Sequence, residues 1–168
     1  ALFDGVVADP PESIVLEAIA ATRAADADIV IGLGGGSSLD TAKIVAALAI
    51  DDAQPLGDIY GVGALAQKGL PNIMIPTTSG TGSEVTAIAI VTTGKTTKAG
   101  IVSPHLYADV AILDPVLTLG LPAHVTAATG IDAMVHAIEA YTGRNAKNPV
   151  SDMLAIEALK LLTTHIET

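Results

Sequence analysis

The stretch IGLGGGSSLDTAK, residues 31–43, decides the fold, because an apolar run passes through three glycines into a helical pattern. Residues 29–33 predict a buried strand and residues 38–50 a helix, with Ser37 and Asp40 at the spacing of a capping box. Such a turn exposes backbone amides at the positive end of the helix dipole, which favours a phosphate. The turn is therefore a candidate pyrophosphate site. The alternative is a tight turn without a ligand, since Ser37 stands where a dinucleotide fingerprint has its last glycine.

A second loop of small residues, PTTSGTGSEVT at residues 76–86, follows a short strand predicted over residues 72–75. Its hydroxyls and free amides suit phosphate or ribose oxygens, and ligands of open α/β sheets collect at the carboxyl ends of strands. Taken alone, the loop is equally well an ordinary turn. Two such loops after two strands can face one crevice, and this favours a dinucleotide site.

The rest of the chain predicts an α/β part followed by a helical part. Further elements are predicted as follows: a helix over residues 12–26, a loop over residues 51–63, strands over residues 85–92, 98–103 and 110–113, and helices over residues 122–142 and 149–166. No strand-like run follows Asp114 and Pro115. We therefore expect an α/β nucleotide-binding domain over residues 1–118 and the start of an all-α domain over residues 119–168.

Composition narrows the class of protein. Half of the 168 residues are apolar, and the aromatic residues are only three tyrosines and one phenylalanine, as in α/β proteins with buried parallel strands. The net charge of −10 argues against a nucleic acid or an anionic membrane as partner. The absence of cysteine excludes disulfides and thiolate metal sites. No apolar run reaches the ~20 residues of a membrane helix, and no signal peptide is evident, so we expect a cytoplasmic protein.

A third motif, TGIDAMVHAIEAYTG at residues 129–143, carries a candidate metal site. Asp132 and His136 are four residues apart, so they share one face of a helix. A carboxylate and an imidazole suit Fe²⁺ or Zn²⁺ better than Ca²⁺. The alternative is a pair that only stabilises the helix, because a metal site needs further ligands. The remaining histidines (His105, His124 and His165) are read as surface or capping residues.

Four motifs together resemble successive signatures of the iron-containing alcohol dehydrogenase family. They are GGGSSLDTAK (34–43), PTTSGTGSEVT (76–86), LDPVLTLGLP (113–122) and TAATGIDAMVHAIEAYTG (126–143). The resemblance implies a dehydroquinate synthase-like fold with the active site in a cleft between its two domains. It also implies an oxidoreductase that transfers a hydride between an alcohol or aldehyde and NAD or NADP, with Fe²⁺ as the expected metal and Zn²⁺ as the alternative.

The resemblance also implies roles for particular residues. The implied cofactor-binding set is Gly35, Gly36, Ser37, Asp40, Thr77, Thr78, Thr81, Thr86 and Lys98. Asp132 and His136 match the first two metal ligands of the family and are the implied catalytic residues.

The chain is shorter than members of this family, and we expect it to be the central part of a longer dehydrogenase. The segment that helps to select NAD or NADP would precede Ala1, and two further histidine ligands would follow Thr168. One alternative is a non-catalytic nucleotide-binding or subunit-contact fragment. Others are same-fold relatives: glycerol dehydrogenases, which differ in the second loop, and maleylacetate reductases, which lack the metal pair. A homo-oligomer is compatible with so apolar a chain.

Overall fold

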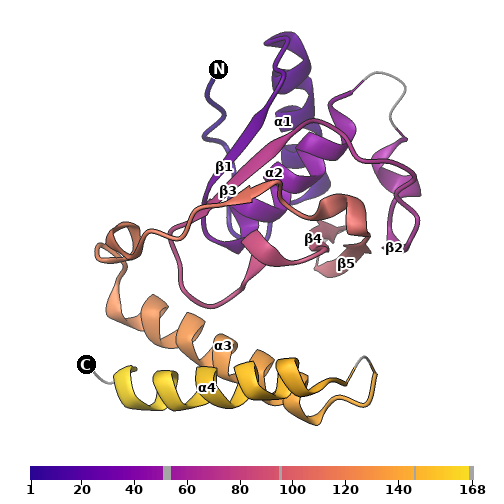
Figure 1. The fold of residues 1–168 in the computed structure, drawn as a ribbon. Helices are drawn as coiled ribbons and strands as arrows, with labels where there is room; N and C mark the ends of the chain where they lie inside the picture. The colour runs from indigo at the N-terminus through magenta and orange to yellow at the C-terminus, as the bar shows by residue number, and fades with distance from the viewer. Residues whose placement is uncertain (51–53, 95, 146, 167–168) are drawn as a thin grey trace. The chain divides into compact units, whose positions relative to one another are not determined.

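The structure is a computed structural model that describes residues 1–50, 54–94, 96–145 and 147–166. The chain divides into two compact units. Unit 1 comprises Ala1–Thr77 and Ser83–Pro115, and unit 2 comprises Thr78–Gly82 and Val116–Thr168. The predicted order, an α/β part followed by helices, is confirmed (Figure 1). Residues 51–53 of the predicted loop lie outside the described residues.

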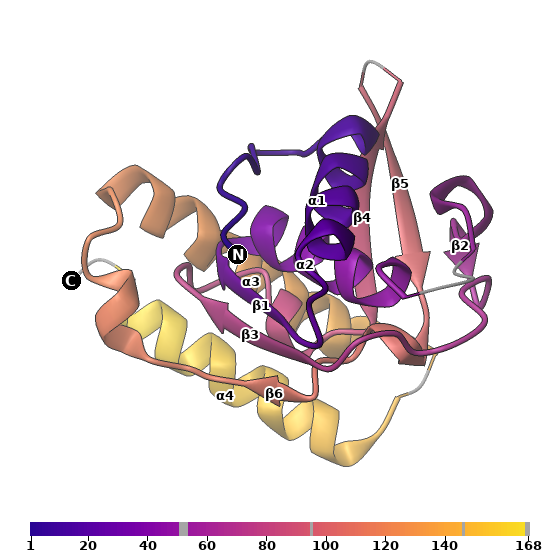
Figure 2. The same ribbon diagram turned by 90° about the horizontal axis from the view of Figure 1, so that it is seen from above.

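The described residues of unit 1 form two small sheets and two helices. Its regular elements are α1 (Glu12–Ala24), β1 (Val30–Gly34), α2 (Gly36–Leu48), β2 (Gly61–Val62), β3 (Asn72–Pro76), β4 (Ile88–Thr93), β5 (Thr97–Val102) and β6 (Val110–Ala111). Three 3-10 turns complete it: η1 (Leu56–Asp58), η2 (Ser83–Val85) and η3 (Pro104–Leu106). In Figure 2, α1 lies beside α2, with the β4–β5 hairpin next to them.

The parallel sheet runs in the order β1-β3-β6. Its register pairs Val30 with Asn72 at one end of β1 and Gly34 with Pro76 at the other. The other sheet has the order β2-β5-β4, with β2 parallel and β4 antiparallel to β5. Because β1 and β3 run in the same direction, the loops that follow them leave the sheet at the same edge.

Helix α2 is the centre of the core of unit 1. Every residue from Thr41 to Leu48 is buried, as expected for a helix covered on all sides. It begins at Gly36, two residues before the predicted start. Gly35 is the N-cap and no side chain caps the helix, so the capping-box prediction is wrong. Asp40 accepts hydrogen bonds from Ser83 and Ile90 instead, and these tertiary contacts outweigh the local motif.

The strand predicted over residues 85–92 is shorter at its start than expected. Residues Ser83–Val85 form the turn η2, and β4 begins at Ile88. From there the predicted alternation holds, since Ala89 and Val91 are buried while Ile88 and Ile90 are exposed.

Unit 2 contains two long helices, α3 (Ala123–Thr142) and α4 (Pro149–His165), which pack side by side (Figure 1). The turn η4 (Pro115–Thr118) precedes them. The predicted N-cap of α4 is confirmed, because the Asn148 side chain accepts a hydrogen bond of 2.9 Å from the Ser151 amide. In the part of the chain that is described, no helix combines the length and the apolar character required to cross a membrane.

Candidate functional site

The first glycine loop has no room for a side chain at Gly34. Gly34 has φ of +145°, and a Cβ at this position would lie 2.6 Å from the Ser38 hydroxyl oxygen. Gly35 is the N-cap residue of α2, and no side chain accepts a hydrogen bond at this cap. Gly35, Gly36 and Ser37 are all partly exposed. The first amides of a helix have no acceptor within the helix, so these groups can receive an anion here.

The second loop begins next to the first. Gly34 and Pro76 are register partners at the ends of β1 and β3, and the Thr77 amide donates a hydrogen bond of 2.9 Å to the Gly34 carbonyl. The predicted cofactor residues Gly35 and Gly36 directly follow β1, and Thr77 directly follows the neighbouring strand β3. The three residues therefore lie at adjacent strand ends. This is the arrangement in which open parallel sheets bind nucleotides.

Two more predicted cofactor residues, Ser37 and Lys98, meet at Asp9. The Asp9 amide donates to the Ser37 hydroxyl at 3.2 Å, and the Lys98 ammonium lies 2.6 Å from the Asp9 carboxylate. The side chains of Lys98 and Asp9 are both more than half exposed. Such an exposed pair is weak, so Lys98 can exchange this partner for a ligand phosphate at small cost.

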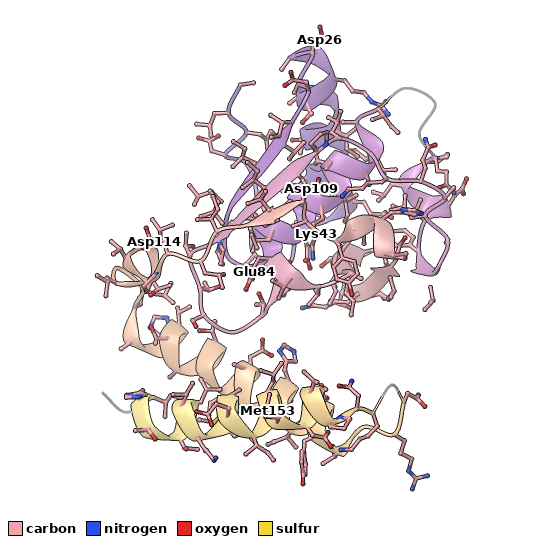
Figure 3. All side chains as sticks on the ribbon, in the orientation of Figure 1. Asp26, Lys43, Glu84, Asp109, Asp114 and Met153 are labelled. Atoms are coloured by element: carbon pink, nitrogen blue, oxygen red, sulfur yellow. The ribbon has the colours of Figure 1, made fainter. Side chains whose placement is uncertain are left out.

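Asp40 belongs to a polar cluster that sequence reasoning recognised only in part. Lys43, one turn further along α2, is the residue it missed: its side chain is completely buried (Figure 3). Burial lowers the pKa of the Lys43 ammonium, and the negative charge and hydrogen bond of Asp40 oppose that shift. The available signal was a lysine followed by the apolar run IVAALAI, which places a charge on a helix with no polar face.

The middle of the second loop belongs to unit 2, where it packs on α3. A Cβ at Gly80 would lie 2.3 Å from the Thr129 carbonyl oxygen, so only glycine permits this approach. Of the two predicted cofactor residues in this segment, Thr78 and Thr81, the Thr78 hydroxyl oxygen is buried and has no hydrogen-bond partner among the described residues. An unpaired buried hydroxyl is costly, and a bound ligand would remove that cost.

Asp132 and His136 lie on consecutive turns of α3, as predicted. The Asp132 Oδ1 and His136 Nε2 atoms are 3.8 Å apart, and the two side chains are about half exposed, at 45% and 50%. Metal–ligand bonds of about 2.0–2.2 Å allow two donors of one ion to lie up to about 4.3 Å apart, so the pair fits two ligands of a divalent cation. Among the described residues no third carboxylate or histidine joins them.

The family comparisons agree with these motifs. Residues 1–115 match the family described as iron-containing alcohol dehydrogenase. Residues 126–168 match the C-terminal family of Fe-containing alcohol dehydrogenases.

Individual relatives are similar over nearly the whole chain. Long-chain-alcohol dehydrogenase 1 of Geobacillus thermodenitrificans (strain NG80-2) is 49% identical, over 96% of this chain and 41% of the relative. The 4-hydroxybutyrate dehydrogenase of Cupriavidus necator is 44% identical, over 99% of this chain and 44% of the relative. The crystal structure of sulfoacetaldehyde reductase from Bifidobacterium kashiwanohense in complex with NAD⁺ gives a TM-score of 0.91 at 37% identity, over 98% of this chain and 44% of that one. The chain thus spans about two fifths of the length of these relatives.

Proposed function

Since this chain belongs to the iron-containing alcohol dehydrogenase family, we propose that the protein is a metal-dependent oxidoreductase that interconverts an alcohol and an aldehyde with NAD or NADP. Relatives whose names describe long-chain alcohol, 4-hydroxybutyrate and sulfoacetaldehyde chemistry support a substrate that bears a hydroxyl or an aldehyde group, and their substrates differ in chain length. The solved relative that carries NAD⁺ supports a nicotinamide cofactor.

One observation carries the proposal: the two glycine-containing loops start side by side at the same sheet edge. The hydrogen bond from the Thr77 amide to the Gly34 carbonyl fixes this pairing. A dinucleotide needs amide donors for its diphosphate and hydroxyls for its ribose oxygens, and the two loops provide both.

The residues of this chain bind and orient the reactants. Amides after Gly34 would receive the diphosphate, and Lys98 would turn from Asp9 toward a phosphate. Asp132 and His136 would hold the divalent ion from one helix face, at the separation that the structure shows. When bound, the ion polarises the substrate oxygen and the nicotinamide accepts or donates the hydride.

The test uses the protein expressed from its complete gene and loaded with Fe²⁺ without oxygen. We expect NAD(P)-dependent oxidation of at least one alcohol from a panel of short-chain and long-chain alcohols, together with about one iron per chain. Asp132→Ala and His136→Ala should each remove iron and lower turnover by more than ~100-fold, because the ion stabilises charge in the transition state. Binding of NADH or NADPH should persist in both variants.

His124→Ala is the matched control, since it removes an exposed imidazole from the start of the same helix. It should keep iron and turnover. Full metal-dependent turnover in both the Asp132→Ala and the His136→Ala variants would overturn the assignment of the metal pair. Tight cofactor binding without any iron uptake or turnover in the unmodified protein would instead favour a non-catalytic nucleotide-binding role.

A further inference from the structure

The buried Lys43 ammonium connects α2 to the second loop. Its Nζ lies 3.1 Å from Asp40 Oδ1 and donates a hydrogen bond of 2.8 Å to the Ser83 carbonyl. It also donates to the Ile88 carbonyl, and the Thr86 hydroxyl oxygen lies 3.4 Å away. An ammonium has three protons, so these partners satisfy it completely. With a side chain that has no exposed surface, Lys43 cannot reach a phosphate in this arrangement.

Both carboxylate oxygens of Asp40 are committed in the same way. Oδ1 accepts a hydrogen bond of 2.5 Å from the Ser83 hydroxyl in addition to its contact with Lys43. Oδ2 accepts a hydrogen bond of 3.0 Å from the Ile90 amide at the middle of β4. A carboxylate repels a diphosphate, so these contacts give Asp40 a role that needs no contact with the phosphates. The motif position implies a cofactor ligand, which stays a prediction, and the contacts add an internal link within unit 1.

The Asp40–Lys43 pair therefore links the start of α2 to the end of the second loop through buried contacts. Asp40 and Lys43 lie in the first two turns of α2, directly after the glycine loop. Their partners lie at Ser83 and Thr86, at the end of the second loop, and at Ile88 and Ile90 in β4. Glu84 lies nearby, and its negative charge adds to that of Asp40 in favouring the Lys43 cation (Figure 3). A buried ion pair contributes little net stability compared with apolar residues, so its value lies in fixing one geometry.

We propose that Asp40 and Lys43 are positioning residues, which hold the glycine loop and the end of the second loop (residues 83–86), both in unit 1, in the binding arrangement before the dinucleotide arrives. This inference rests on the proposed function, because it assumes that the two loops bind a dinucleotide. A site organised in advance loses less entropy on binding, so release of the link weakens cofactor binding without removing any cofactor contact. The hydride-transfer step, which depends on the metal pair, is affected much less.

The experiment measures dissociation constants for NADH and NADPH, from nicotinamide fluorescence, in the protein expressed from its complete gene. Lys43→Met keeps an unbranched side chain that is one heavy atom shorter and carries no charge, and it should raise the dissociation constant of the preferred cofactor by about 10-fold or more. Turnover at saturating cofactor should change by less than about 3-fold, so the effect appears in KM rather than in kcat. The double variant Asp40→Asn/Lys43→Met should bind no more weakly than Lys43→Met, because both changes break one link.

Leu48→Ala is the matched control for a general loss of stability. Leu48 is 2% exposed on the same helix but at its other end, so this variant should lower Tm while the dissociation constant changes by less than about 2-fold. If Lys43→Met fails to fold, Asp40→Asn and Ser83→Ala decide the question, since each removes one contact of the link. Each should raise the dissociation constant by about 3-fold or more.

The outcomes separate this inference from the proposed function. If the unmodified protein binds neither NADH nor NADPH, the proposed function is wrong and the inference falls with it. If the unmodified protein binds a cofactor and the Asp40, Lys43 and Ser83 variants bind it equally well, only the positioning role is overturned. The same holds if Leu48→Ala weakens binding in proportion to its loss of Tm, or if the Lys43 variant loses kcat with an unchanged dissociation constant.

Discussion

The two units of the chain differ in how well they support the residues assigned to them. Unit 1 has an extensive core, in which α2 is buried from Thr41 to Leu48. In unit 2 the buried residues of the two helices are only Gly130, Ala137 and Ala155, although both helices are apolar. The glycine loop and the two ends of the second loop, which lie in unit 1, are thus supported by a packed core. Asp132 and His136 lie on α3, which packs on α4, and few described residues of these two helices are buried.

This difference has a functional meaning. A binding site holds its geometry only when the surrounding residues lock its side chains. The hydrogen bonds of Asp40 and Lys43 provide that support in unit 1. Asp132 and His136 are about half exposed, and the described residues place no third ligand beside them. We therefore expect dinucleotide binding to be the more robust property of these residues, and metal binding the more fragile one.

The largest expected effect compares a buried side chain of unit 1 with an exposed apolar side chain of unit 2. Ile44 on α2 has no exposed surface, whereas Leu154 on α4 is 60% exposed. In the 168-residue chain, Ile44→Ala should lower the free energy of unfolding by ~2–5 kcal/mol, because it leaves a cavity in a packed core. Leu154→Ala should change it by less than ~0.5 kcal/mol. Urea unfolding followed by circular dichroism measures both. Equal losses would show that the face of α4 around Leu154 is covered in solution, and would break the comparison.

The second prediction concerns the glycine loop of unit 1, which we expect to be as rigid as the packed core. Gly34→Ala places a side chain at φ of +145° and next to the Ser38 hydroxyl. The strained backbone should cost ~1–3 kcal/mol of unfolding free energy, read from the urea midpoint. Gly100→Ala in β5 is the control, since a Cβ there meets no atom within 4 Å, and it should be nearly neutral. A neutral Gly34→Ala would mean that the loop adapts freely and is not preformed.

The sequence predicted most elements of unit 1, because they depend on local signals. The loop predicted over residues 51–63 was wrong in part, since it contains the turn η1 and the two-residue strand β2, which pairs with the distant strand β5. The apolar run before Gly34 and the proline at the end of the next strand mark β1 and β3, and their loops are rich in glycine and hydroxyls. What failed depends on distant contacts. The Lys43 hydrogen bond to Ser83 joins residues 40 positions apart, and no helix pattern encodes that partner. The expected capping box failed for the same reason, because Ser83 and Ile90 recruit the Asp40 carboxylate.

In the candidate site, too, the sequence predicted the features that depend on local spacing and missed those that depend on distant residues. The spacing of Asp132 and His136 was enough to place both side chains on one helix face, because four residues make about one turn. It could not show whether other ligands approach that face, since these would come from other parts of the chain. The contact of Lys98 with Asp9 was equally hidden, because Asp9 lies 89 positions away.

A third and smaller effect tests whether unit 2 has well-defined helix ends despite its thin core. Asn148 caps α4 through the Ser151 amide, and Asn148→Ala should cost ~1 kcal/mol of helix stability. Faster hydrogen exchange of the first-turn amides of α4 would report this loss. Asn145→Ala, an exposed asparagine in the same connection, is the control and should leave the exchange unchanged. If both variants exchange at the rate of the unmodified chain, the cap contributes nothing and the helix end is held by other contacts.

The smallest expected effect is a pH dependence in unit 1. The Lys68 ammonium and the backbone N–H of Asn72 both donate hydrogen bonds to the Asp109 carboxylate. These two hydrogen bonds lower the pKa of Asp109 below the ordinary value of 3.8. The ionised form is thus favoured in the folded state, so its stabilisation is complete above pH 3.8 and is lost as the pH falls through the lowered folded pKa. Asp109→Asn should therefore destabilise the chain near neutral pH and converge with the unmodified chain in acid. The difference should stay below ~1 kcal/mol, because the pair is partly exposed and screened.

The urea midpoints of the two chains at about pH 6 and about pH 3 measure this convergence. Lys68→Met supplies the control. This variant lacks the main cause of the lowered Asp109 pKa, so its unfolding free energy should fall less between the two pH values than that of the unmodified chain. An equal gap between Asp109→Asn and the unmodified chain at both pH values would show that the Asp109 charge is not what matters. In that case the backbone pairing of β3 with β6, Ile73 with Val110 and Met74 with Ala111, accounts for the contact between the two strands, and the Asp109 charge adds nothing measurable.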